Sequence, residues 1–421
     1  MSVEGWKKVR ISEFGVIVTG STPDTKNSSY WDGDIPFVSP ADFNSSTFVV
    51  KTYKNLTDEG AKRARIVPKN SILVTCIGSI GGISIAPWDC VTNQQINSII
   101  CSDDFDNIFV YLLIQNNLHR LVELAGITTL PIINKRTFGD IELFCPNSVS
   151  EQTQIATILS TIDRAIEQTE ALIAKQQRIK TGLMQDLLTK GIDENGNIRS
   201  EETHKFKDSP LGRIPVEWEV KKIEQKLERI IDYRGQTPKK VTEGIPLLTA
   251  KNVRDGFIEK EPQEFIADSA YNSWMSRGIP EVGDVLFTTE APMGNVASIP
   301  NYRIALAQRL LTLCPKINEL SQDFLFWILH WKRSKERIEL LTSGSTVVGI
   351  KQSVFRKVIF AFPSYNEQER IYAVLNSHDE INKNEKHKLK KLQRLKTGLM
   401  QDLLTGKVRV TDLLNQKTAT N

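Results

Sequence analysis

The decamer KTGLMQDLLT occurs twice in this chain, at residues 180–189 and again at 396–405. Ten identical residues at two distant positions indicate an internal duplication, so the fold has to accommodate two copies of one plan. Two copies are too few for a repeat stack, in which each unit packs only on its neighbours. The sequence therefore predicts a molecule built from two related halves with an internal pseudo-two-fold repeat.

The similarity between the two halves extends upstream of the decamer. Residues 144–168 align with 362–384, and both segments contain a proline followed by Glu-Gln and then by isoleucine and leucine at helical spacing. Each copy is thus a variable block of about 150 residues followed by a nearly invariant segment of about 40. Shorter similarities pair Trp6 with Trp218, GSTP (20–23) with GQTP (235–238), IPFV (35–38) with IPLL (245–248), and 126–138 with 344–355.

The variable blocks have the pattern of α+β globules. Short runs rich in β-branched residues, at 71–78, 82–88 and 96–101, predict strands separated by turns. One amphipathic helix is predicted at 107–124, with a counterpart at 323–341 in the second block.

The nearly invariant segments are predicted to be long helices. Between residues 150 and 188 there is no proline, and Gly182 is the only glycine. A 4-3 spacing predicts a coiled-coil seam with several polar positions, and because neither helix can bury such a stripe alone, the two helices are expected to pair with each other. The seam positions are Ile155, Leu159, Ile162, Ile166, Thr169, Ile173, Gln176, Lys180 and Leu183, and Ile371, Leu375, His378, Asn382, Glu385, Leu389, Leu392, Lys396 and Leu399.

Connectivity favours an antiparallel pair of helices. Each globule leads directly into its own helix, and an antiparallel pair leaves the linker only a local connection to make, although a linker of this length could also serve a parallel pair. The fold class is thus α+β, with two similar domains separated by two long helices in an antiparallel coiled coil about 50 Å long. The expected boundaries are 1–148 (domain 1), 149–190 (helical spacer 1), 191–215 (linker), 216–364 (domain 2), 365–407 (helical spacer 2) and 408–421 (tail).

Composition narrows the class of protein further. No apolar run is long enough to span a bilayer, and the first residues do not resemble a signal peptide. The cysteines are odd in number and without a C-x-x-C pair, which favours reduced thiols in the cytoplasm and no zinc site. A net charge of +4 permits nucleic-acid binding without arguing for it. The cysteines are Cys76, Cys90, Cys101, Cys145 and Cys314.

The sequence has none of the motifs that mark a nucleotide-binding enzyme, an adenine methyltransferase or a zinc hydrolase. GLMQDLLTGK has the wrong spacing for a phosphate-binding loop. There is no Asn-Pro-Pro-aromatic string, no glycine-rich dinucleotide fingerprint, and no His-Glu-x-x-His among the five scattered histidines. The sequence therefore predicts no catalytic and no metal-binding residues.

Two similar but non-identical domains on a rigid spacer suit a ligand with two different parts at a set distance. Duplex DNA has this format, because its grooves repeat about every 34–36 Å. The domains are then expected to read an asymmetric, bipartite DNA sequence.

The ordered, duplicated motifs resemble those of the specificity subunit of a type I restriction-modification enzyme. The resemblance covers nearly the whole chain and rests on GSTP and GQTP, the Gly-x-Thr loops at 126–128 and 344–346, the helix starts with Glu-Gln, and the two decamers. It implies that the variable blocks are target-recognition domains for double-stranded DNA. It also implies that the helices dock two modification (methyltransferase) subunits, and that restriction (motor-nuclease) subunits complete the complex. S-adenosylmethionine, ATP and magnesium would then be bound by those partners, and no cofactor by this chain.

Candidate DNA-binding residues lie in polar and basic loops of both domains. Lysine, arginine, serine and threonine suit phosphates, whereas arginine, asparagine and glutamine suit base edges. For any single residue, a solvated loop or a turn is the alternative. The candidates are Thr22, Lys62, Arg63, Arg65, Ser79, Asn93, Gln94, Gln95, Asn97, Lys135 and Arg136 in domain 1, and Arg234, Thr237, Lys251, Asn252, Arg254, Thr288, Thr289, Asn295, Gln308, Arg309, Ser345 and Lys351 in domain 2.

The repeated decamer is the candidate partner-binding element. Coiled-coil packing alone tolerates many apolar choices, so identity suggests contact with the same partner twice; a recent duplication is the alternative. The candidates are Lys180, Leu183, Met184, Leu187, Leu188, Lys396, Leu399, Met400, Leu403 and Leu404.

Three other functions stay open at the level of sequence. The chain could belong to a related system whose methylation and cleavage activities share one partner polypeptide. It could be a coiled-coil adaptor that binds no DNA. A self-contained methyltransferase or nuclease is the third alternative, against which the absent cofactor motifs count.

Overall fold

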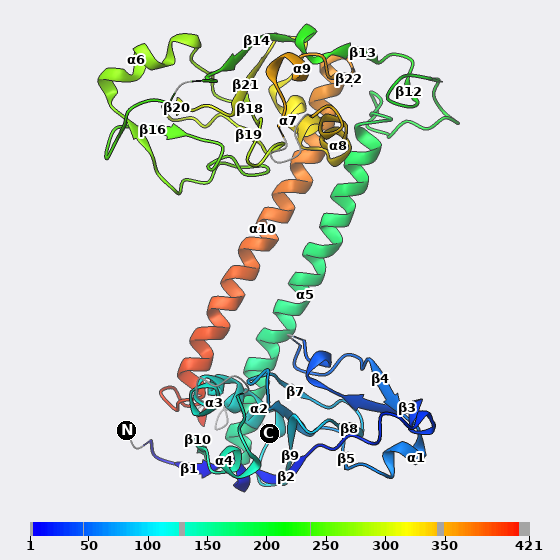
Figure 1. The fold of residues 1–421 in the computed structure, drawn as a ribbon, viewed down its shortest axis with the longest axis vertical. Coiled ribbons are helices and arrows are strands. Elements are labelled where there is room, and N and C mark those ends of the chain that lie inside the picture. The colour runs from blue at the N-terminus through cyan, green and yellow to red at the C-terminus, as the bar shows by residue number, and fades with distance from the viewer. Residues whose placement is uncertain (1–2, 45, 126–130, 236, 343–348, 412–421) are drawn as a thin grey trace, which may run out of the picture. The chain divides into compact units, whose positions relative to one another are not determined.

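The computed structural model describes residues 3–44, 46–125, 131–235, 237–342 and 349–411. The chain forms two compact units, the first made of residues 1–171 with 387–421 and the second of 172–386 (Figure 1). Each unit therefore combines one globule with the first part of the helix that follows it and the last part of the other long helix. The division between the units falls within the long helices.

The globule of the first unit contains three small sheets. Strands β1 and β10 form an antiparallel pair, β2-β9-β6-β7 form an antiparallel sheet, and β4-β3-β8-β5 form a mixed sheet in which β3 and β8 are parallel. The predicted strands at 71–78, 82–88 and 96–101 are confirmed as β6, β7 and β9. The bounds are β1 Trp6–Arg10, β2 Gly15–Thr19, β3 Trp31–Val38, β4 Lys54–Leu56, β5 Ile66–Val67, β6 Ile72–Thr75, β7 Ile83–Ile85, β8 Cys90–Thr92, β9 Ile96–Cys101 and β10 Glu142–Pro146.

The second unit repeats this plan. Its sheets are β13-β22, β14-β21-β18-β19 and β15-β17-β16-β20, with β16 parallel to β20, and the linker adds the hairpin β11-β12. The predicted internal repeat is therefore confirmed at the level of strand pairing. The bounds are β11 Phe206–Lys207, β12 Ile214–Pro215, β13 Glu219–Lys222, β14 Leu227–Asp232, β15 Lys240–Val241, β16 Ile245–Leu248, β17 Phe265–Ile266, β18 Val285–Thr288, β19 Val296–Ser298, β20 Ala305–Leu306, β21 Leu310–Pro315 and β22 Ile359–Phe362.

Each globular helix predicted as a single element is broken in two. The segment 107–124 forms α2 (Asn107–Asn116) and α3 (Leu118–Ala125), because the Asn117 side chain turns back to donate to the Leu113 carbonyl at 2.8 Å. The segment 323–341 forms α7 and α8, because Trp331 between them has an extended backbone. The bounds of the remaining short helices are α1 Asp58–Ala61, α4 Lys135–Gly139, α6 Tyr271–Trp274, α7 Gln322–His330, α8 Lys332–Glu339 and α9 Gln352–Phe355.

The two long helices are α5 (Val149–Leu187) and α10 (Tyr365–Leu403), each of 39 residues. In the first unit, Asp163 near the start of α5 meets Lys396 near the end of α10, with 2.6 Å between the charged atoms. In the second unit, Lys180 near the end of α5 meets Asp379 near the start of α10 at 2.5 Å. The helices therefore run antiparallel in each unit, as predicted.

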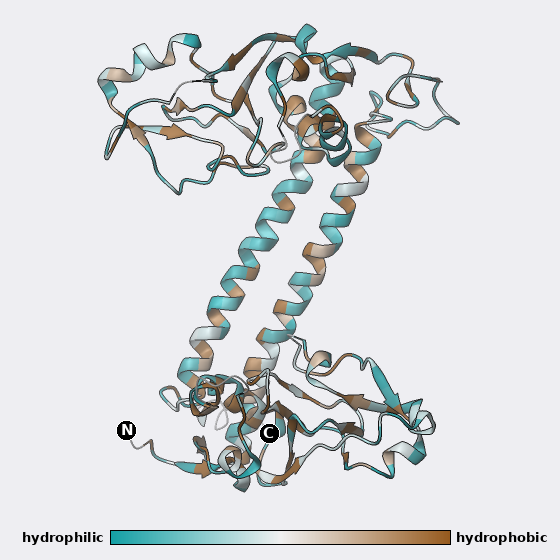
Figure 2. Cartoon of the chain, in the orientation of Figure 1, coloured by the Kyte–Doolittle hydropathy of each residue, from teal (hydrophilic) through white to brown (hydrophobic). Residues whose placement is uncertain are grey.

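The predicted seam positions are all buried or half-buried. Ile155 and Leu159 are fully buried in the core of the first globule, and Ile371 and Leu375 in that of the second. The coiled-coil seam thus continues into the globular cores at the start of each helix. Elsewhere both helices are mostly hydrophilic, with isolated apolar residues (Figure 2).

An equivalent arginine–glutamate ion pair closes each unit. In the second unit, Arg199 contacts Glu367 in the first turn of α10, and the Trp218 indole donates to the same carboxylate at 3.2 Å. Arg199 follows the first decamer, so it ties the end of one long helix to the start of the other. The equivalent group in the first unit is Trp6, Glu151 and Arg409.

All five cysteines are free, and burial is the main cause that raises their thiol pKa values. The pKa of Cys76 rises to about 11, and those of Cys90 and Cys314 rise to about 12. Among the described residues, no cluster of side chains has the composition of a metal site. None of the helices in the described ranges is both long and apolar enough to cross a bilayer.

Candidate nucleic-acid and partner interfaces

The GSTP loop at 20–23 lies against the turn that leads into β9. The Ser21 amide donates to the Thr92 carbonyl at 2.8 Å, and the Gly20 amide to the Ile96 carbonyl at 3.0 Å. A Cβ atom on Gly20 would lie 2.0 Å from the Asn93 carbonyl oxygen, so this close approach requires glycine. The glycine of the motif thereby brings the loop threonine next to the turn.

The threonine of this loop is hydrogen-bonded to a glutamine in both units. Thr22 Oγ1 lies 2.5 Å from Gln94 Oε1, and both residues are exposed. In the second unit, Gln308 Nε2 lies 3.4 Å from Thr237 Oγ1. The glutamines occupy equivalent positions, two residues before β9 and β21. Two predicted DNA-binding motifs, distant in sequence, therefore meet at equivalent positions in each globule, although the threonine hydroxyl donates to Gln94 in the first unit and accepts from Gln308 in the second.

Most of the basic candidates for DNA contact are on the surface. Arg65 is exposed, although its guanidinium also donates to the Thr19 carbonyl at 2.7 Å beside the GSTP loop. Arg309 is paired with Glu290 at 2.8 Å. The candidates exposed to solvent are Thr22, Lys62, Arg63, Arg65, Ser79, Gln94, Lys135, Arg136, Arg234, Thr237, Lys251, Arg254, Arg309 and Lys351.

Four polar candidates are buried and have to be corrected. Asn97 is 3% exposed and accepts a hydrogen bond from the Thr19 hydroxyl at 2.7 Å. Asn252 is 2% exposed and holds its own turn, accepting from the Thr249 amide at 3.0 Å. Thr288 and Thr289 are also buried, so none of the four presents its side chain to DNA.

Four further candidates are half-buried and hydrogen-bonded within the chain: Asn93, Gln95, Asn295 and Gln308. The Asn93 side chain accepts from the Gln95 amide at 3.1 Å and donates to the Gln95 side chain at 2.9 Å, which is the turn-holding role. Asn295 donates to the Val253 carbonyl at 2.8 Å. Ser345 and the Gly-x-Thr loops at 126–128 and 344–346 lie outside the described residues.

The apolar residues of the decamers are buried or half-buried and contribute to the cores of the two units. Leu187 and Leu188 are buried in the core of the second unit, and Leu403 and Leu404 in that of the first. Met184 and Lys180 are buried too. The remaining candidates, Leu183, Lys396, Leu399 and Met400, are half-buried.

The decamers also share residues that are exposed to solvent. Thr181 and Gln185 are exposed in the first copy, as are Thr397 and Gln401 in the second. A Cβ atom built on Gly182 or on Gly398 would meet no atom within 4 Å. Packing within the chain therefore accounts for the identity of the leucines but not for that of this outer face.

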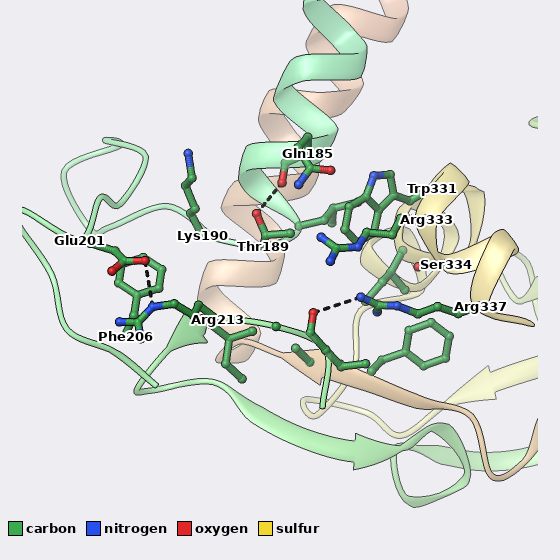
Figure 3. A pocket seen from close by; sticks show the side chains of 17 residues that line it. Gln185, Thr189, Lys190, Glu201, Phe206, Arg213, Trp331, Arg333, Ser334 and Arg337 are labelled. Atoms are coloured by element: carbon green, nitrogen blue, oxygen red, sulfur yellow. Dashed lines mark hydrogen bonds and ion pairs between the residues drawn. The ribbon is translucent and has the colours of Figure 1, made fainter. Parts of the chain in front are cut away.

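A cavity of about 260 Å³ lies at the end of the first decamer, between Thr189, the linker hairpin and α8 (Figure 3). Arg337 donates to the Leu211 carbonyl there at 3.1 Å, and burial together with the neighbouring Arg333 lowers its pKa. The first unit has a matching cavity of about 340 Å³ at the end of the second decamer, where Arg120 donates to the Glu142 carbonyl at 2.7 Å. Each decamer thus ends beside an arginine-lined hollow, which the sequence pattern did not reveal.

The duplicated fold and the duplicated loop define a two-domain recognition protein, and the family comparison identifies its kind. The model of the family described as "Type I restriction modification DNA specificity domain" matches residues 3–176 and again residues 215–394. The chain therefore belongs to this family. Its members are specificity subunits, and catalysis lies in other subunits.

Curated relatives agree with this assignment, and a solved structure has the same fold. The MjaVIII specificity subunit of Methanocaldococcus jannaschii is 27% identical over 430 residues, covering 97% of this chain and 94% of that protein. The HindI specificity subunit of Haemophilus influenzae is 33% identical over 172 residues, or 39% of this chain and 38% of that protein. The crystal structure of the S subunit from M. genitalium has the same fold, with a TM-score of 0.62 at 18% identity, and covers 94% of this chain and 96% of its own.

Proposed function

We propose that this chain is the DNA-recognition subunit of a type I restriction-modification complex and reads a bipartite, asymmetric target, one domain for each half-site. The observation that carries the proposal is the repeated loop pairing: two domains of the same topology place a threonine–glutamine pair at equivalent positions within different surroundings, with Gln94 exposed and Gln308 half-buried. Equivalent placement supports one way of approaching DNA, and different surroundings support two different half-sites.

We also propose a set distance between the two half-sites. A helix of 39 residues rises about 58 Å, which exceeds one turn of DNA. Within each unit one ion pair joins the two long helices: Asp163 with Lys396 in the first and Lys180 with Asp379 in the second.

Partner subunits are proposed to dock on the outer face of the decamers. Thr181, Gly182 and Gln185 are repeated as Thr397, Gly398 and Gln401, which suits two equivalent modification subunits. The restriction subunits join the same complex in the cytoplasm. S-adenosylmethionine, ATP and magnesium are proposed to be bound by these partners and not by this chain.

Methylation mapping tests the proposal directly. The chain is expressed with its modification subunits, and the methylated positions in genomic DNA are sequenced. A split motif with a constant gap is expected. The matched variant carries residues 216–364 from a relative, and only one half of the motif should change.

Two outcomes would contradict the proposal. A change in both halves of the motif after the exchange would refute independent domains. No methylated motif with either chain, although the complex assembles, would refute DNA recognition and favour an adaptor that binds proteins.

A further inference from the structure

We propose that Gln94 and Gln308 each read one base edge in the half-site of their domain, and that Thr22 and Thr237 are positioning residues that hold the glutamine amides. The inference rests on the proposed function, because it concerns the same DNA interface. It adds which side chain reads a base and which one orients it.

The loop is built to present this pair. Gly20 allows the backbone to approach the Asn93 carbonyl, and Pro23 is buried, so Thr22 lies on a stretch anchored at both sides. In the second unit, Gly235 has a positive φ of 84°, which favours glycine at the same place in the loop. The two loops thus use different backbone features to bring the threonine next to a glutamine at an equivalent position.

The glutamine is the member of its turn that stays available. In the first unit, Asn93 and Gln95 bond to each other, and Gln95 also donates to the Ile77 carbonyl at 3.4 Å. Among the described residues, Thr22 is the hydrogen-bond partner of the Gln94 side chain. A single exposed hydrogen bond adds little to stability, so the recurrence of the pair in both domains points to a role in binding.

The chemistry of the pair suits a purine edge in the major groove. A glutamine amide offers a donor and an acceptor side by side, which matches N6 and N7 of adenine. With one amide atom facing the threonine, Gln94 and Gln308 each retain a donor and an acceptor for a base. Holding the amide in advance reduces the entropy lost on binding. Nearby arginines such as Arg65 suit the phosphates.

Paired alanine substitutions test the inference in the assembled complex with its modification subunits. The probe is a library of DNA duplexes randomised one position at a time around the motif mapped with the unaltered chain. Gln94→Ala should lower discrimination about ten- to hundredfold at one position of one half-site, and Gln308→Ala should do so in the other half-site. Each variant is the control for the other, because the untouched half-site should keep its preference.

Substitutions of the threonine separate positioning from contact. Thr22→Val removes the hydroxyl and should weaken discrimination at the position that Gln94→Ala affects, whereas Thr22→Ser should retain it. Equal weakening on all sequences with a shallower salt dependence would assign the pair to phosphates and overturn the inference. Unchanged preference at every position would overturn it as well. Because the unaltered chain defines the motif first, failure of the proposed function would be seen as the absence of any motif.

Discussion

Arg409 Nε lies 2.6 Å from Glu151 Oε1, although 258 residues separate them in the chain. Arg409 follows the second decamer, and Glu151 lies in the first turn of α5. Arg199 has the same relationship to Glu367 in the second unit. The segment that follows the second decamer therefore closes the first globule, and the segment that follows the first decamer closes the second globule.

Replacing Arg409 with alanine should destabilise the first unit. The Glu151 side chain is only 2% exposed, so the substitution leaves a buried carboxylate with the Trp6 indole as its remaining side-chain partner. Breaking such a pair costs about 3 kcal/mol in free energy of unfolding, which denaturant unfolding monitored by tryptophan fluorescence would measure. Arg213→Ala is the matched control, because its ion pairs are half-exposed and should change stability by less than about 1 kcal/mol. An equal effect of both substitutions would show that the Arg409–Glu151 ion pair stabilises the fold no more than an exposed ion pair does.

The Lys180–Asp379 pair makes stability depend on pH at the acidic end. Burial alone would raise the pKa of Asp379, but hydrogen bonds from Lys180 and Lys383 lower it below its ordinary value of 3.8. Since the pKa is lower in the folded state, the ionised carboxylate stabilises the fold above about pH 4, and this contribution is lost as the pH falls through the folded pKa.

Asp379→Asn should therefore cost about 2 kcal/mol at pH 7, and the gap between the variant and the unaltered chain should narrow below pH 4. Denaturant midpoints at pH 7, 5 and 3.5 would measure this. Asp208→Asn is the control, since that side chain is 89% exposed. A gap that stays constant down to pH 3.5 would mean that the lowered pKa of Asp379 does not contribute.

Patterns that depend on neighbours along the chain were predicted well, whereas burial set by distant segments was not. Every position that the 4-3 spacing predicted for the seam is buried or half-buried, because helix geometry alone decides which residues share a face. By contrast, Asn252 and Thr288 look like exposed Thr237 in sequence, yet the fold buries the first two.

In the decamer, too, the properties set by neighbouring residues were predictable, and those set by distant segments were not. Its helical character was evident from the sequence. The burial of Leu188 and Leu404 depends on a globule contributed by another part of the chain. The threonine–glutamine pairs likewise join loops more than 70 residues apart, which no local pattern specifies.

Asn382 in the seam is expected to limit stability. It is 3% exposed, and in the described part of the chain its side-chain oxygen has no hydrogen-bond partner, while its nitrogen lies 3.3 Å from the His378 carbonyl. Asn382→Leu should raise the free energy of unfolding by about 1 kcal/mol, because it removes an unsatisfied buried group and adds apolar surface to the seam. Lys386→Leu, at an exposed position of the same helix, should not. Destabilisation by Asn382→Leu would indicate that the amide is satisfied in solution, for example by water.

Substitutions of Gly182 test whether the exposed face of the decamer binds a partner. Glycine in mid-helix costs about 1 kcal/mol relative to alanine, and a Cβ atom there meets no atom of this chain within 4 Å. Gly182→Ala should therefore raise the stability of the isolated chain by up to about 1 kcal/mol. If a partner backbone approaches this glycine closely, Gly182→Phe should weaken binding of the modification subunit at least tenfold while leaving the chain folded.

The matched control for Gly182→Phe is Ala174→Phe, on an exposed position of α5 outside the decamer. Titration of the purified chain with modification subunit would compare the two variants, and thermal unfolding would check their folds. Because Gly398 is equally open, the double variant of Gly182 and Gly398 should lose both bound subunits, and each single variant only one. Full binding by Gly182→Phe would show that the identity of the outer face reflects duplication and not docking.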